Sequence, residues 1–180
     1  MKIRRGIKGL SIIVSVLLGL LIPCLFYLYF FNAEERQPLP NAVQITNQPL
    51  PASTLVNVEG FNISSKVREG KVLIIFLSSN CPACKKDVEI ISRVYTNLSS
   101  KIQIYGISIE KKDDILTFAN KTGIKFPVLI DVNAELFNKL QIRYFPTKFL
   151  IEDGVITKTL FGNFPNEEKV FEDLEIGNFK

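Results

Sequence analysis

The longest apolar run in the chain lies close to its N-terminus. Leu10–Phe31 contains no charged residue and follows a basic flank, residues 1–9. As a helix that rises about 1.5 Å per residue, this run would be about 33 Å long, close to the hydrocarbon thickness of a bilayer. The pattern predicts one transmembrane anchor with a cytoplasmic N-terminus and the rest of the chain outside. A cleaved signal peptide is the alternative, although its apolar core is normally about 7–15 residues long.

The segment after this run, residues 32–51, is polar and rich in proline. Four of its residues are Pro38, Pro40, Pro49 and Pro51. Proline fixes φ and lacks a backbone N–H, which opposes both helices and central strands. The segment is therefore predicted to be an extended tether, and the folded domain is assigned to residues 52–180.

Beyond the tether, strand patterns alternate with helix patterns. Val72–Leu77 is a continuous apolar run, typical of a strand buried on both faces. Pro82–Leu98 has apolar residues every three or four positions, as on one face of a helix. Similar patterns predict strands at 102–109, 127–130, 147–152 and 155–161, and helices at 113–122, 133–140 and about 166–176. The order predicts an α/β fold with a mixed central sheet and helices on both faces.

Composition and charge exclude several functions. The sequence has no histidine, which excludes a Ser-His-Asp triad, a Cys-His dyad and a histidine-ligated metal. The net charge is +4, from 22 basic and 18 acidic residues. The four residues Lys2, Arg4, Arg5 and Lys8 account for the whole excess, so the remaining chain is formally neutral. The basic charge therefore indicates membrane orientation and does not indicate nucleic-acid binding.

The one reactive motif is Cys81-Pro82-Ala83-Cys84, between the strand at 72–77 and the helix that follows. A C-x-x-C motif beside a βαβ pattern is typical of a redox dithiol. A cysteine at a helix N-terminus meets unpaired N–H groups and the positive end of the helix dipole, which favour its thiolate. Cys81 is therefore the expected nucleophile, and Cys84, one turn later, the buried thiol that resolves a mixed disulfide.

The cysteine pair has two alternative roles, a metal site and a static disulfide. A closed zinc site needs four ligands, and the only further cysteine is Cys24, inside the apolar run. We therefore expect no metal and no organic cofactor. A static disulfide in a non-enzymatic docking module stays open as an alternative, although so small a loop constrains the unfolded chain very little.

Several motifs in order resemble one family. They are G-K-V-L-I-I-F-L-S-S-N-C-P-A-C-K-K-D, F-P-V-L-I-D and Y-F-P-T-K-F-L-I-E-D-G-V-I, within about residues 51–171. On these motifs the chain resembles membrane-anchored thiol:disulfide oxidoreductases of the TlpA/ResA type, within the redoxin group. The stretch S-S-N-C-P-A-C-K is also similar to MauD-type proteins. The resemblance implies a thioredoxin-like fold and dithiol–disulfide exchange with protein substrates.

The resemblance also implies roles for single residues. Pro146 would be the cis-proline that faces the disulfide, and Phe145 would line the same substrate groove. Asp87 stands where the family often has glutamate, a carboxylate that can shuttle the proton of the resolving thiol; the alternative is an exposed helix residue favoured by the dipole. Asn80 replaces a tryptophan common in the family, and with Pro82 it is assigned to the substrate-binding surface.

The partners and location also follow from the resemblance. It implies a reductant of exocytoplasmic or periplasmic proteins, for example in cytochrome c maturation, which is re-reduced by a transmembrane electron donor of the CcdA/DsbD kind. The expected location is the cell (inner) membrane, spanned once. A peroxiredoxin-like peroxidase is a further alternative, since it shares the fold; of its motif P-x-x-x-[ST]-x-x-C, Ser78 matches but Ile74 occupies the proline position.

Overall fold

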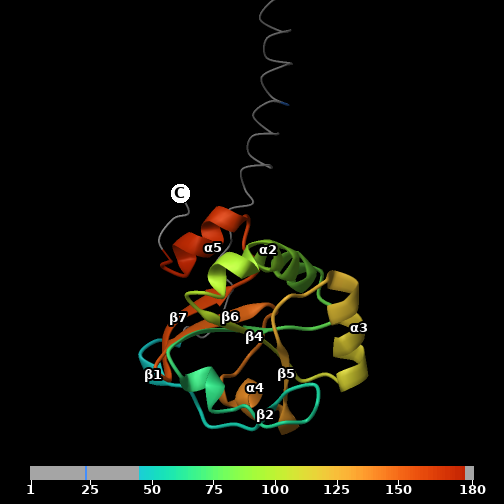
Figure 1. Ribbon diagram of the computed structural model, residues 1–180, viewed down its shortest axis with the longest axis vertical. Helices are drawn as coiled ribbons and strands as arrows, with labels where there is room; N and C mark the ends of the chain where they lie inside the picture. The colour runs from blue at the N-terminus through green and yellow to red at the C-terminus, as the bar shows by residue number, and fades with distance from the viewer. Residues whose placement is uncertain (1–22, 24–44, 177–180) are drawn as a thin grey trace, which may run out of the picture. The chain divides into compact units, whose positions relative to one another are not determined.

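The computed structural model in Figure 1 describes residues 45–176 and the single residue Pro23. Apart from that proline, the apolar run predicted to span a membrane lies outside the described residues, so the anchor stays a prediction. Within the described part of the chain, none of the helices is both long and apolar enough to cross a bilayer.

The described residues form one mixed sheet of seven strands in the order β1-β7-β6-β3-β4-β5-β2. The strands are β1 (Gln48–Pro49), β2 (Leu55–Val56), β3 (Lys71–Phe76), β4 (Gln103–Ser108), β5 (Val128–Asp131), β6 (Thr147–Glu152) and β7 (Val155–Phe161). β3, β4 and β5 run parallel, whereas β6 and β7 are antiparallel to their neighbours. The two-residue strands β1 and β2 close the sheet edges in antiparallel pairing. The predicted mixed sheet is confirmed.

Helices cover both faces of the sheet, and β3 shows why. Its side chains alternate between two cores: Leu73 and Ile75 pack on one side, Ile74 and Phe76 on the other. The first face is covered by the longer helices and the second by the shorter ones, as Figure 1 shows for α2 and α5 against α4. The helices are α2 (Pro82–Leu98), α3 (Lys112–Thr122), α4 (Glu135–Lys139) and α5 (Glu167–Asp173), with the 3-10 turns η1 (Lys66–Arg68) and η2 (Val132–Ala134).

The helix ends have local causes that are visible in the sequence. Gly123 ends α3 in a left-handed conformation, with φ of 63°. The side chain of Asn166 accepts a hydrogen bond from the N–H of Lys169 at 2.8 Å and so begins α5. The predicted turn at Asp153 and Gly154, both with positive φ, joins β6 to β7.

The last residues of the predicted tether are part of the folded unit. Gln48 and Pro49 form β1 against β7, and the side chain of Leu50 is only 3% exposed. The guanidinium of Arg68 donates to the carbonyls of Leu50 and Pro51, at 2.6 and 2.5 Å. Proline is accepted here because β1 is an edge strand, where a missing N–H need not break the ladder. The folded unit therefore extends from Ala52 back to at least residue 45.

Candidate active site

Cys81 and Cys84 lie at the start of α2, just beyond the carboxyl end of β3. Cys81 is the N-cap residue, and its Sγ accepts a hydrogen bond from the N–H of Cys84 at 3.1 Å. Pro82 occupies the first helical position, where its missing N–H has no intrahelical partner to lose. Both thiols are free, Cys81 partly exposed and Cys84 fully buried. The two sulfurs therefore differ in access to solvent, as an attacking and a resolving thiol should.

The surroundings of Cys84 favour the protonated thiol. Burial raises the pKa of Cys84 most strongly, and the hydrogen bond with Cys81 raises it further. The charges of Cys81 and Asp87 act in the same direction, while a backbone hydrogen bond with Ser78 opposes them. Cys84 is therefore a thiol at neutral pH, and its attack on another sulfur requires a group that takes its proton.

The Phe145–Pro146 peptide bond is cis and lies against the exposed thiol. The Cys81 thiol donates to the carbonyl oxygen of Phe145, with 3.6 Å between sulfur and oxygen. The carbonyl of Pro146 accepts from the N–H of Gly162 at 2.9 Å, which ties this turn to β7. The Phe145 ring stacks on Phe137, with 6.0 Å between the ring centroids. The structure thus brings Phe145 and Pro146 to Cys81, where the resemblance had assigned them.

The loop before Cys81 is held by a carboxylate that the sequence analysis missed. Glu110 accepts a hydrogen bond from the Ser78 hydroxyl at 2.7 Å and from the N–H of Ser79 at 3.0 Å. Glu110 follows β4, which pairs in parallel with β3, so their carboxyl ends meet at the same sheet edge. The sequence could have pointed to this contact, because residues that follow two neighbouring parallel strands lie at the same edge of the sheet. Asn80, the next residue of the loop, is exposed, as is Pro82.

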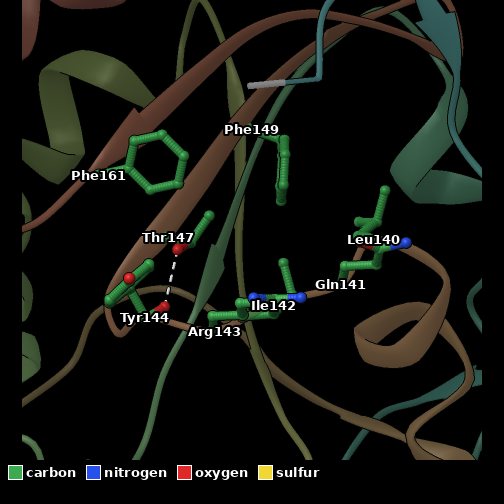
Figure 2. A pocket seen from close by; sticks show the side chains of 8 residues that line it. All are labelled: Leu140, Gln141, Ile142, Arg143, Tyr144, Thr147, Phe149 and Phe161. Carbon is green, nitrogen blue, oxygen red and sulfur yellow. Dashed lines mark hydrogen bonds between the residues drawn. The ribbon is translucent and has the colours of Figure 1, made fainter. Parts of the chain in front are cut away.

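Two hollows lie near the site. One, of about 210 Å³, separates the loop before Cys81 from α3. Its lining consists of Ser79, Asn80, Asp114, Thr117, Phe118 and Lys121. The other, shown in Figure 2, lies between the Leu140–Tyr144 segment and the strands β6 and β7; its free volume of about 10 Å³ suits at most one water molecule. Only the first is large enough to receive a substrate side chain.

Asp87 is fully buried, so the alternative that it is an exposed helix residue is wrong. Its Oδ1 accepts a hydrogen bond from the N–H of Phe164 at 2.8 Å. Its Oδ2 forms an ion pair with Nζ of Lys148 at 3.0 Å. Helix periodicity places Asp87 on the face of α2 that carries Cys84, and β6 and the segment before α5 then cover it.

Lys148 was not recognised as a site residue from the sequence. It lies in β6, which is flanked by β3 and β7, and its side chain is 1% exposed. Its ammonium also donates to the carbonyl of Gly162 and lies 4.2 Å from the centroid of the Phe164 ring. A lysine within a strand expected to be covered on both faces was the available signal, because such a charge needs a partner in the interior.

Comparisons with known proteins agree with this geometry. The model of the AhpC/TSA family matches residues 46–159. The chain belongs to the AhpC/TSA family. That match covers most of the folded unit, including both cysteines and the Phe145–Pro146 turn.

The relatives confirm the predicted resemblance and enzyme class. Sporulation thiol-disulfide oxidoreductase A of Bacillus subtilis (strain 168) is 28% identical over 167 residues, which cover 89% of this chain and 94% of that protein. Thiol-disulfide oxidoreductase ResA of Bacillus thuringiensis (strain Al Hakam) is 25% identical over 161 residues, covering 87% and 89%. The crystal structure of StoA from Bacillus subtilis superposes with a TM-score of 0.59 at 26% identity, over 69% of this chain and 97% of that one. The chain is a thiol:disulfide oxidoreductase with a thioredoxin-like fold.

Proposed function

We propose that Cys81 and Cys84 are the redox pair of this enzyme and that it reduces disulfides of exocytoplasmic proteins. One observation carries the assignment of roles. Cys81 is accessible and caps α2, with the N–H of Cys84 3.1 Å from its sulfur, whereas Cys84 is buried. A peptide N–H directed at a sulfur stabilises negative charge there, so Cys81 is suited both to attack and to leave as a thiolate.

The reaction takes place in two exchanges. The thiolate of Cys81 attacks the substrate disulfide, so a bond forms between Cys81 and one substrate sulfur while the other substrate sulfur leaves as a thiolate. Cys84 then loses its proton and attacks Sγ of Cys81, which releases the second substrate sulfur. Two electrons pass to the substrate, the substrate sulfurs take up two protons, and Cys81 and Cys84 end as a disulfide.

The substrate segment binds next to the exposed thiol. The Phe145–Pro146 turn lies on one side of Cys81 and offers backbone groups to a chain in extended pairing. Asn80 and Pro82 are exposed beside the same sulfur and complete the contact surface. A protein chain, which has a backbone to pair, fits this surface better than a small thiol does.

The cellular setting of the proposal rests on the sequence. Residues 10–31 would anchor the enzyme in the cell membrane with its folded unit on the exocytoplasmic side. Electrons to re-reduce the pair would then come from a transmembrane donor of the CcdA/DsbD kind. Apocytochrome c, whose haem-attaching cysteines must be reduced, is the client class that the family resemblance supports.

The test is exchange by the full-length protein, purified in mild detergent. The wild-type pair should equilibrate with glutathione, and a reduction potential near that of thioredoxin, about −270 mV, would support a reductant, whereas one near that of DsbA, about −120 mV, would contradict it. Cys84→Ser should accumulate mixed disulfides through Cys81, and Cys81→Ser, the matched control, should not. A pair that fails to exchange, or equal capture by both variants, would refute the mechanism and favour a static disulfide.

A further inference from the structure

The starting point is a lysine whose charge is enclosed by the protein. Lys148 is 1% exposed and extends from β6 into the core beneath α2. Its ammonium lies 3.0 Å from Oδ2 of Asp87, donates to the carbonyl of Gly162, and lies 4.2 Å from the centroid of the Phe164 ring. A buried ammonium is costly unless it is paired and hydrogen-bonded, and these neighbours satisfy that requirement.

The partners of Asp87 favour its ionised form. One carboxylate oxygen accepts from the peptide N–H of Phe164 and the other from the ammonium of Lys148. Protonation would remove the negative charge of the carboxylate and so weaken both of these hydrogen bonds. An ionised carboxylate can nevertheless take up a proton briefly during a reaction step.

Asp87 lies on the same face of α2 as the buried thiol of Cys84. The two residues are three positions apart on α2, where side chains lie on the same face of a helix. The negative charge of Asp87 is one of the causes that raise the pKa of Cys84. Cys84 is buried and must lose a proton to attack, and an adjacent carboxylate can take it without bulk water.

We propose that Lys148 is a positioning residue of the redox site: it holds Asp87 as an oriented carboxylate, so that Cys84 has a proton acceptor throughout the neutral pH range. The inference rests on the proposed function. In the resolving step, the S–H bond of Cys84 breaks and its proton passes to Asp87. The bond between Cys84 and Cys81 forms, the bond between Cys81 and the substrate breaks, and the electron pair leaves on the substrate sulfur. The proton then passes from Asp87 to solvent.

The surroundings of Asp87 make Lys148 its counter-ion. The titratable groups around it include Lys148 from β6 and the thiol of Cys84 from α2 itself. β3 contributes apolar side chains to this core, and the segment before α5 contributes peptide groups. The ion pair that links α2 to α5, Arg93 with Glu167, is exposed at the surface. Removal of the Lys148 charge would therefore leave Asp87 without the ammonium that neutralises it.

The kinetic test compares disulfide exchange by full-length wild type, Lys148→Met and the double variant Asp87→Asn/Lys148→Met. Methionine keeps much of the length of the side chain without its charge. In Lys148→Met the carboxyl is buried without a counter-ion and takes up a proton in the neutral range. The ratio of the Lys148→Met exchange rate to the wild-type rate should therefore fall by roughly 10-fold or more between pH 8.5 and pH 6. The double variant has no carboxyl to titrate, so its rate relative to wild type should not vary with pH.

A second measurement does not depend on enzymatic activity. In wild type labelled with ¹³C at aspartate carboxyls, the Asp87 signal, identified by its absence from the double variant, should not shift between pH 5.5 and 8.5. In Lys148→Met it should shift within that range. The inference is overturned if Asp87 titrates there in wild type, or if the Lys148→Met rate ratio does not vary with pH. If wild type exchanges no disulfides at all, the proposed function fails, while the carboxyl signal still decides whether Lys148 holds Asp87 ionised.

Discussion

The buried thiol of Cys84 makes the stability of the reduced protein depend on alkaline pH. In the unfolded chain this thiol has its ordinary pKa of 9.0, and in the folded protein burial raises the pKa well above that value. Between these two values the unfolded chain has lost the proton that the folded chain still holds. The folded state then binds more protons, so the free energy of unfolding must fall as pH rises. The contribution is complete below about pH 8.

The size of this loss in the free energy of unfolding depends only on the pKa of the thiol in the unfolded chain. Above pH 9 each further pH unit removes about 1.4 kcal/mol for one proton retained only in the folded state. Integrated from pH 8 to pH 10, with the unfolded thiol titrating at 9.0, the loss is about 1.4 kcal/mol. Lysine and tyrosine side chains also begin to titrate near pH 10, so their contributions must be cancelled by a control that retains them.

The assay is urea denaturation of the fully reduced protein at pH 8, 9 and 10, with Cys84→Ala as the control. Alanine cannot ionise, and the cavity that it leaves gives an offset that does not vary with pH. The difference in the free energy of unfolding between the two proteins should therefore shrink by about 1.4 kcal/mol across the window. A difference that stays constant within a few tenths of a kcal/mol would show that the folded protein does not keep Cys84 protonated.

Two further predictions concern the groups that surround the dithiol. Lys148→Met should lower the free energy of unfolding by about 3–5 kcal/mol, because the Asp87 carboxyl then either stays charged without a counter-ion or must take up a proton in the interior. Urea denaturation should show that adding Asp87→Asn restores most of the loss, and two additive losses would argue against a coupled pair. Glu110→Gln should cost roughly 1 kcal/mol and slow glutathione exchange, since Glu110 holds Ser78 and Ser79 before Cys81. The exposed Glu59→Gln is its control, and equal behaviour of the two variants would mean that Glu110 does not order the loop.

The elements that form the scaffold could be predicted because their signals are local. The run of β3 and the periodicity of α2 each report on a few neighbouring residues, and the helix ends at Gly123 and Asn166 depend on a single backbone or side-chain group. The same holds for Cys81 and Cys84, since their spacing alone puts the first at the cap and the second one turn into the helix. Neither these elements of the scaffold nor the positions of the two cysteines require knowledge of the rest of the chain.

The surroundings of the dithiol could not be predicted in this way. The sequence placed Asp87 near Cys84, yet its burial depends on Lys148, 61 residues later, and on the N–H of Phe164, 77 residues later. Residues 45–51 looked like the end of a tether because four prolines occur in residues 32–51, but β1 pairs with β7 about a hundred positions away. Glu110 reaches Ser78 only because β4 lies beside β3.

The physical distinction is between interactions that one segment makes with itself and those that need two segments to meet. Backbone periodicity, caps and the C-x-x-C spacing are of the first kind, and for this protein they determined the α/β fold and the positions of Cys81 and Cys84, the proposed redox pair, at the start of α2. The charge state of Asp87 is of the second kind, because an ion pair in the interior is stable only when both partners are removed from water together. The tertiary structure alone decided that Lys148 is the residue opposite it.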